Sequence, residues 1–180
     1  GTSAVSENEI RTKLELLNQK NTPILTLNQL ESLIEISRTK SEKIIMTNGC
    51  FDILHPGHIY YLMKAKELGD KLIVAVNTDR SVSLLKGETR PINNLSHRME
   101  VLKGLYSVDW LIPFDEDTPE DLIKKIKPDI LVKGSDYKIN EIAGADYVLK
   151  NGGKVITIDL IKGVSSSNII NKIKTNFQSN

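Results

Sequence analysis

The chain has 180 residues, of which 39% are hydrophobic and 26% charged, and this is enough for one domain with a substantial core. Its 24 basic and 23 acidic residues leave a formal net charge of +1, which excludes a protein that coats nucleic acid through its overall charge. The single cysteine excludes an internal disulfide and a cysteine-based zinc cluster. No apolar run approaches the roughly 18 residues of a membrane span. We therefore expect a cytoplasmic protein that binds neither a membrane nor nucleic acid.

Two helical segments are predicted before the first strand. Residues 4–22 are weakly amphipathic, and residues 26–40 begin with Thr26 and Gln29 in the spacing of a capping box and carry an apolar stripe. We expect residues 1–43 to form an N-terminal helical extension packed on the core. Residues 44–180 would then form the main domain.

Five short apolar runs alternate with amphipathic segments along the rest of the chain. The runs lie at residues 43–48, 71–77, 108–114, 129–134 and 154–160. Each is nearly continuous in β-branched and aliphatic residues, which is typical of strands covered on both faces. The segments between them carry apolar residues at helical spacing, and in one of them Thr118 and Pro119 are predicted to cap and to begin the helix. The pattern predicts a Rossmann-like, doubly wound α/β fold with five parallel strands.

The sequence TNGCFDILHPGH, residues 47–58, joins the first strand to the next helix; its residues 50–58 are called the histidine turn below. Pro56 suits the first turn of a helix, and Gly57 leaves room where a ligand or a strand backbone comes close. His55 and His58 would share one face of that turn, beside unpaired backbone N–H groups. Because ligands of such sheets bind at the carboxyl ends of the strands, the turn predicts an anion site that suits phosphate.

Other sites for this turn are disfavoured. A zinc site would need more ligands than His55 and His58, and the third histidine, His97, lies far along the chain with no cysteine cluster. The G-x-G-x-x-G pattern of dinucleotide sites and the Walker pattern are both absent from the sequence.

Two further segments carry groups suited to phosphate. Lys86, Arg90 and Arg98 follow the second strand in a loop, broken by glycine and proline, that runs into a helix. We assign Lys86 to the reacting phosphates and the two arginines to the acceptor phosphate or to support. The last predicted helix opens with three hydroxyl side chains, those of Ser165, Ser166 and Ser167. Their hydroxyls and the helix-start amides suit the β- and γ-phosphates of a nucleotide.

The pattern H-x-G-H after a strand that ends in NGCFD resembles the nucleotidyltransferase superfamily, whose members transfer a nucleotidyl group from a nucleoside triphosphate to a phosphate acceptor and release pyrophosphate. The hydroxyl-rich start of the last helix is similar to its second signature. A longer set of motifs is similar to the adenylyltransferase domains that make ADP-heptose for lipopolysaccharide: TNGCFDILHPGHIYYL, VAVNTDRSVSLLKGETRPIN, VDW, DEDTPEDLI, DILVKGSDY, EIAGADYV and NGGKV. This resemblance extends from about Ile24 to Ile173.

The resemblance implies an enzyme that transfers AMP from ATP to D-glycero-β-D-manno-heptose 1-phosphate, giving ADP-heptose and pyrophosphate, with Mg²⁺ bound to the triphosphate. The acceptor phosphate has a second pKa of about 6 and is largely dianionic near pH 7, so no general base is required. His55 and His58 would supply donors at the α-phosphate. The resemblance also implies a homodimer. Since the sequence contains no sugar-kinase domain, a separate heptose kinase is expected to supply the substrate.

The resemblance also assigns residues around the substrates. Besides the three serines, the implied nucleotide-binding residues are Cys50, Phe51, Gly57, Lys133, Gly134 and Asp136. Asn48 and Asp52 are assigned to the acceptor phosphate or to support, with Asp52 ordering the histidine turn, and no metal ligand from the protein is assigned. Asn48, Asn77 and Asp79 offer hydroxyl-binding groups to a polyhydroxylated acceptor.

Two alternatives stay open. The first is a cytidylyltransferase that acts on glycerol 3-phosphate or a similar small phosphate, but Leu160 stands where related cytidylyltransferases carry an arginine. The second is a catalytically inactive, nucleotide-binding regulatory protein. The presence of His55, His58 and Lys86 with the three serines disfavours it.

Overall fold

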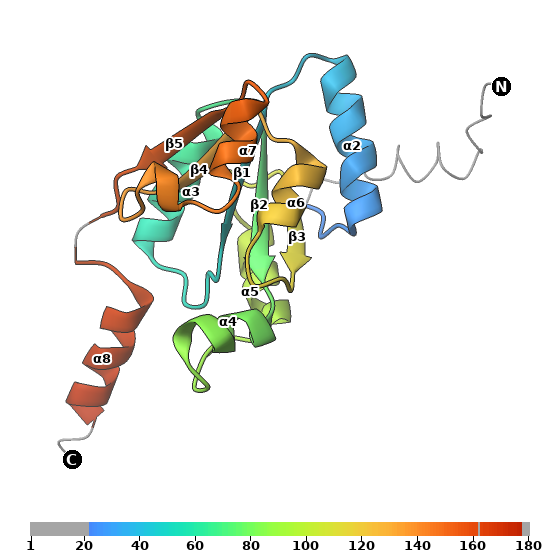
Figure 1. Cartoon of the computed structure of the whole chain (residues 1–180). Coiled ribbons are helices and arrows are strands. Elements are labelled where there is room, and N and C mark those ends of the chain that lie inside the picture. The colour runs from blue at the N-terminus through green and yellow to red at the C-terminus, as the bar shows by residue number, and fades with distance from the viewer. Residues whose placement is uncertain (1–21, 162, 178–180) are drawn as a thin grey trace.

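The computed structural model describes residues 22–161 and 163–177 and contains one five-stranded sheet flanked by helices (Figure 1). The strands are β1 (Ile44–Gly49), β2 (Lys71–Asn77), β3 (Trp110–Phe114), β4 (Ile130–Gly134) and β5 (Lys154–Ile158). All neighbours pair in parallel in the order β3-β2-β1-β4-β5. The order reverses between β1 and β4, which confirms the predicted doubly wound fold.

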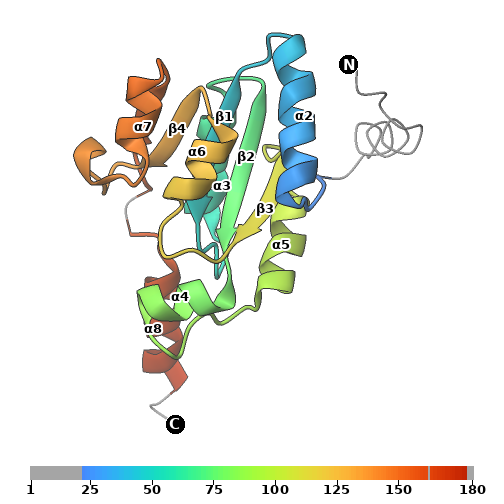
Figure 2. The same cartoon turned by 45° about the vertical axis from the view of Figure 1, so that its right-hand side comes forward.

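Helices cover both faces of the sheet (Figure 2). They are α2 (Leu27–Thr39), α3 (Pro56–Lys66), α4 (Asp79–Lys86), α5 (Leu95–Lys103), α6 (Glu120–Ile126), α7 (Ala145–Lys150) and α8 (Ser166–Phe177), with a 3₁₀ helix at Ile139–Glu141. Helices α2, α6 and α7 pack on one hydrophobic cluster, and α3 and α5 pack on the other. In the described part of the chain no helix is both long and apolar enough to cross a membrane.

The predicted helix before β1 is present as α2, and it begins with the expected capping box between Thr26 and Gln29. Its apolar stripe, Leu30, Leu33 and Ile34, lies in the core. The helix therefore packs on the domain, while the proposed boundary at residue 43 stays a prediction. The amphipathic segment predicted at residues 4–22 lies outside the described residues except for Thr22.

Two local predictions were wrong. Helix α6 begins at Glu120, with Pro119 at the N-cap position and no side-chain cap, so Thr118 does not cap it. Lys86 was expected in a loop, but it is the last residue of α4, a helix that the sequence reading missed. The hydroxyl of Thr78 caps α4 by accepting a hydrogen bond from the backbone N–H of Ser81.

Two aspartates accept hydrogen bonds from backbone N–H groups at the amino ends of β1 and β2. The Asp129 carboxylate accepts a hydrogen bond from the backbone N–H of Ile44 at 2.7 Å, where β1 begins. The Asp109 carboxylate accepts one from the N–H of Leu72 at 2.7 Å in β2 and pairs with Lys66 at 2.6 Å. Polar backbone groups at this edge of the sheet thus have partners within the protein.

Candidate active site

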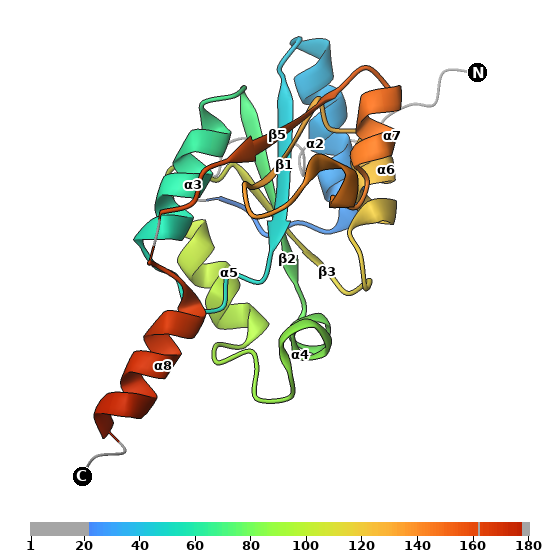
Figure 3. The same ribbon diagram turned by 60° about the vertical axis from the view of Figure 1, so that its left-hand side comes forward.

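A pocket of about 550 Å³ opens at the carboxyl ends of the strands. Helix α4 and the start of α8 lie beyond this end of the sheet (Figure 3). The pocket is lined by most of the residues that the sequence singled out, namely Asn48, Cys50, Phe51, Asp52, His55, Gly57, His58, Lys86, Arg90, Lys133, Gly134, Asp136, Ser165, Ser166 and Ser167. Among the predicted site residues, Arg98 does not line it. The pocket therefore lies where the strand order reverses, as expected for a ligand site of this fold.

The two histidines of the turn stack on each other. His55 is the N-cap residue of α3 and His58 lies in its first turn. Their ring centroids are 3.8 Å apart with an interplanar angle of 22°, and the Phe51 ring lies 5.3 Å from that of His58. Both Nδ1 atoms are buried, and no described residue hydrogen-bonds to them. Buried polar atoms rarely lack partners, so a ligand is the natural partner for this pair.

Both imidazoles are neutral near pH 7 in the free protein. Burial, aided by His55 and Lys86, lowers the pKa of His58 to about 4. Burial also lowers the pKa of His55 below its usual range. Each neutral ring offers one N–H donor. An anion bound beside them would favour the protonated form and raise these pKa values.

Gly57 separates the histidines and makes room for one of them. A Cβ at position 57 would lie 3.0 Å from Nδ1 and 3.1 Å from Cε1 of His55. The closest protein neighbour is therefore the His55 ring, and since Gly57 also lines the pocket, the expected approach of a ligand stays a prediction.

Asp52 ties the histidine turn to the loop at residues 87–93. Its buried carboxylate accepts hydrogen bonds from Arg90 Nε at 2.6 Å and from the backbone N–H groups of Ile92 and Asn93 at 2.8 Å each. Burial by itself raises the pKa of Asp52, but these hydrogen bonds and the guanidinium outweigh it and hold the pKa below its usual value. Asp52 thereby fixes Arg90 at the pocket wall.

Arg98 is wholly buried and links three segments behind the pocket. It donates hydrogen bonds to the backbone carbonyls of Cys50 and of Asn93, the latter at 3.0 Å, and to the Asp79 carboxylate at 2.8 Å. This geometry suits the supporting role and leaves Arg98 no contact with the pocket. Asp79, expected to offer a hydroxyl-binding group, is instead engaged by Arg98 at the start of α4.

Lys133 brings a third cation to the pocket, beside Lys86 and Arg90, and comes from β4. Its Nζ donates to the Asn48 carbonyl at 3.2 Å and lies 5.3 Å from the centroid of the Tyr137 ring. Burial lowers the pKa of Lys133 to about 8. A bound anion would favour the charged form and restore the full positive charge.

The three serines differ in what their hydroxyls do. The Ser165 hydroxyl accepts a hydrogen bond from the backbone N–H of Asn168 at 3.1 Å, and Ser166 donates to the carbonyl of Ile53 in the histidine turn at 3.0 Å. Ser167 is exposed at the start of α8. The amides of this twelve-residue helix and the Ser167 hydroxyl are thus available to an anion.

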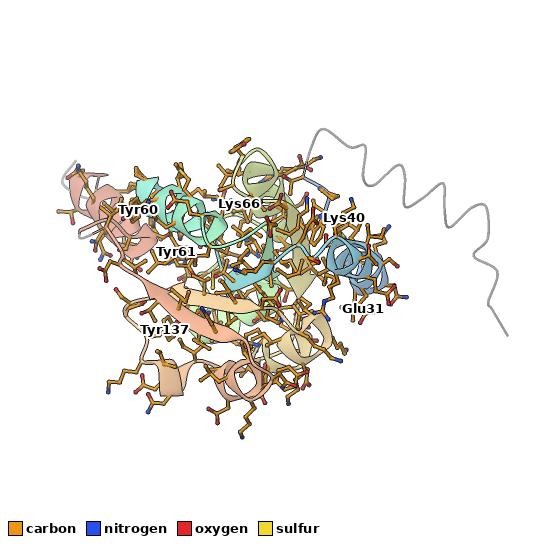
Figure 4. The ribbon with its side chains drawn as sticks, turned by 90° about the horizontal axis from the view of Figure 1, so that it is seen from above. Glu31, Lys40, Tyr60, Tyr61, Lys66 and Tyr137 are labelled. Carbon is orange, nitrogen blue, oxygen red and sulfur yellow. The ribbon has the colours of Figure 1, made fainter. Side chains whose placement is uncertain are left out.

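The structure adds two tyrosines that the sequence reading missed, and they come from opposite faces of the sheet (Figure 4). Tyr61 on α3 is buried and shares a hydrogen bond of 2.7 Å with the Thr47 hydroxyl. Its place three residues after His58, on the same helix face, was an available signal. Tyr137 had no such signal, because only the fold brings its ring to Lys133.

Residues 46–172 match the model of the family described as cytidylyltransferase-like. The chain is 56% identical over 174 residues to the bifunctional protein HldE of Actinobacillus succinogenes and 55% identical over 174 residues to that of Haemophilus influenzae (strain PittGG). In both cases 97% of this chain is covered, but only 37% of the relative. The chain therefore spans little more than a third of the length of these curated relatives.

Solved structures show the same fold. The chain is 33% identical to the lipopolysaccharide core biosynthesis protein from Thermoplasma volcanium GSS1, with a TM-score of 0.55 over 68% of this chain and 99% of that one. Pantoate-beta-alanine ligase from Francisella tularensis is 22% identical, with a TM-score of 0.58 over 86% of this chain and 78% of that one, and shares the fold alone. Since the family model matches more than half of its length, the chain belongs to the cytidylyltransferase-like family, in agreement with the nucleotidyltransferase resemblance of its H-x-G-H pattern.

Proposed function

We propose that this pocket transfers AMP from ATP to D-glycero-β-D-manno-heptose 1-phosphate and releases pyrophosphate, giving ADP-heptose for lipopolysaccharide or surface polysaccharide synthesis. The observation that carries the proposal is the stacked pair of His55 and His58, which line the pocket and whose buried Nδ1 atoms have no partner among the described residues. The motifs shared with ADP-heptose adenylyltransferase domains support the acceptor. The identity to bifunctional HldE proteins and to a lipopolysaccharide core biosynthesis protein supports it as well.

In this reaction a phosphate oxygen of the acceptor forms a bond to the α-phosphorus of ATP. The bond from that phosphorus to the oxygen bridging to the β-phosphorus breaks, and the electron pair leaves with pyrophosphate. The attacking phosphate is a dianion near pH 7, so no proton has to be removed first. The protein must therefore hold two anions in line and stabilise the charge that builds up between them.

The residues of the pocket divide this work. His55 and His58 donate hydrogen bonds to the α-phosphate, and Lys86 and Lys133 offset the added negative charge. Ser167 and the first amides of α8 hold the outer phosphates. Arg90, which pairs with Asp52, contacts the acceptor phosphate.

Mg²⁺ is proposed to arrive with the triphosphate as part of the substrate. No group of three or more His, Cys, Asp or Glu side chains that could hold a metal ion occurs within residues 22–161 and 163–177. Phosphate oxygens are suitable ligands for Mg²⁺, which commonly keeps several waters and few protein ligands. The ion would neutralise charge on the leaving pyrophosphate.

Adenine is the proposed base because an apolar side chain lines the nucleotide end of the pocket. Leu160 Cδ1 lies 3.1 Å from the position of a Cβ built on Gly134, at the end of β4. The related cytidylyltransferases carry an arginine in place of this leucine. Leu160 offers no hydrogen bond that would select cytosine.

The proposal is tested by pyrophosphate release from ATP, CTP and GTP, each with a panel of sugar and polyol phosphates. We expect ATP with the heptose 1-phosphate to exceed CTP with glycerol 3-phosphate at least about tenfold in kcat/KM. A faster CTP reaction would contradict the heptose assignment and favour the cytidylyltransferase alternative. Nucleotide binding without pyrophosphate release from any pair would favour the regulatory alternative. The homodimer, the separate heptose kinase and the cytoplasmic location stay predictions.

A further inference from the structure

Two asparagines end neighbouring strands and share one face of the sheet. Asn48 lies near the end of β1 and pairs in register with Ala75, while Asn77 ends β2. Paired residues of neighbouring strands point to the same face, and so do residues two apart in one strand. Asn48, Ala75 and Asn77 therefore point to one face. Both asparagines line the pocket.

Their carboxamide oxygens lack strong donors. Asn48 Oδ1 is buried, and no described residue donates to it. Asn77 is 3% exposed, and its Nδ2 donates to the Ser81 hydroxyl at 2.9 Å. Its Oδ1 then faces the Cys50 thiol, whose sulfur is 4.0 Å away, and a thiol is a weak donor. Burial raises the pKa of Cys50, so the thiol keeps its proton.

A side-chain oxygen that can only accept hydrogen bonds cannot favour the binding of a phosphate dianion. A phosphate dianion has only acceptor oxygens, so Asn48 Oδ1 and Asn77 Oδ1 would face it without a hydrogen bond. Hydroxyl groups do have protons to donate. Leaving such buried acceptors unpaired is costly, which makes them selective for ligands that carry hydroxyls at the matching positions.

The hydroxyls belong to the acceptor because of the strand order. Strand β2 lies on one side of β1, and β4 lies on the other. Gly134 ends β4 and Asp136 follows it, so these two of the proposed nucleotide contacts lie on the β4 side of the pocket and Asn77 lies on the β2 side. The ribose of the nucleotide is the other possible source of hydroxyls, and the test below distinguishes the two.

We propose that Asn48 and Asn77 accept hydrogen bonds from hydroxyl groups of the acceptor and thereby select a polyhydroxylated phosphate over a simple phosphate monoester. This inference rests on the proposed function and identifies the side chains that select its acceptor. Asp79, at the start of α4, has no part in it because it does not line the pocket.

The test compares Asn48→Leu, which keeps the approximate size of the side chain and removes its hydrogen bonds, with Asn28→Leu on the exposed side of α2. Steady-state kinetics give KM for the heptose 1-phosphate and for ATP. Propyl phosphate, a monoester with no hydroxyl, serves as a competitive inhibitor against the acceptor. We expect Asn48→Leu to raise KM for the heptose phosphate at least about tenfold. KM for ATP and inhibition by propyl phosphate should stay within about twofold, and Asn28→Leu should match the wild type.

Three results separate the outcomes. A rise in KM for ATP with an unchanged acceptor KM would mean that Asn48 contacts the ribose, and the inference would be wrong. An equal loss for propyl phosphate and the heptose phosphate would also overturn it, because hydroxyls would then not matter. If Asn48→Leu fails to fold, the smaller Asn48→Ala is measured in the same way. A wild-type protein that releases no pyrophosphate with any acceptor would contradict the proposed function itself and the inference with it.

Discussion

The two edges of the sheet treat their polar groups in opposite ways. At the amino edge, Asp129 and Asp109 accept hydrogen bonds from the backbone N–H groups of Ile44 in β1 and Leu72 in β2. At the carboxyl edge, the buried Asn48 Oδ1 and the Nδ1 atoms of His55 and His58 have no partner among the described residues. Buried polar groups with hydrogen-bond partners contribute to stability. Buried polar groups without partners lower it and are retained where a ligand supplies the missing hydrogen bond. Substitutions at the first edge should therefore change stability, and substitutions at the second should change activity.

The largest expected effect comes from the histidine pair. His58→Ala should lower kcat at least about a hundredfold, the usual scale for losing one donor to the transition state, while unfolding stays cooperative. His97→Ala, at an exposed position of α5, is the matched control and should leave kcat unchanged. Pyrophosphate release measures the first property and thermal unfolding the second. Near wild-type turnover for His58→Ala would make the pair structural.

Lys86 tests whether the exposed end of α4 belongs to the site. Lys86→Ala should lower kcat roughly tenfold or more and change KM for ATP less, because the lysine is proposed to act on charge that develops between the reacting phosphates. Lys40→Ala, at the end of α2 and away from the pocket, should have no effect. A change in KM alone would assign Lys86 to ground-state binding.

At the amino edge, a substitution should lower stability and leave activity unchanged. Asp129→Ala leaves the N–H of Ile44 without its partner and should lower the free energy of unfolding by about 1.5 kcal/mol, with kcat and KM unchanged. Asp129→Asn keeps an acceptor oxygen and should lose less. Denaturant unfolding and steady-state kinetics on the same samples measure both properties. Lost activity in a stably folded Asp129→Ala protein would contradict the division between the edges.

The smallest effect is a dependence of stability on pH. Because the pKa of His58 is about 4 in the folded protein and about 6.5 when unfolded, the unfolded chain binds more protons between these values. The contribution of neutral His58 is complete above pH 6.5 and is lost as the pH falls toward 4. Relative to pH 7.5, the wild type at pH 5.5 should have lost about 1 kcal/mol more than His58→Ala, because His55, whose pKa burial also lowers, adds a loss to both proteins. Equal losses in the two proteins would mean that another group titrates.

Much of the fold could be predicted because local signals agreed with the tertiary structure. The five apolar runs became the five strands, and Pro56 begins α3 as expected. Helix α4 was missed although Thr78 provides a cap, because the glycine and proline that follow it suggested a loop throughout. The direction of the Arg98 side chain could not be predicted either, because an arginine on a helix can point toward the core or toward solvent. Only the packing of α5 shows that Arg98 points inward.

The sequence predicted which residues form the candidate site, but it did not predict which of their polar atoms have hydrogen-bond partners. The strand–helix turn and the H-x-G-H pattern were enough to bring His55 and His58 together at the carboxyl edge. Nothing local indicates that the Asn48 oxygen lacks a donor or that Asp79 is engaged by Arg98, because both depend on residues far away in the chain. Whether a polar group has a partner is a property of the fold.

The room that Gly57 leaves beside His55 has a consequence for surveys of genomes. Alanine at this position would favour the helix by about 1 kcal/mol over glycine. Its Cβ, however, would press on the His55 ring at 3.0 Å and disturb the stack. Alanine here would thus keep both histidines of the pattern but require the His55 ring to move by a few tenths of an ångström. The bare glycine is therefore part of what sets the position of the His55 ring, and a search pattern for this turn should require it together with the two histidines.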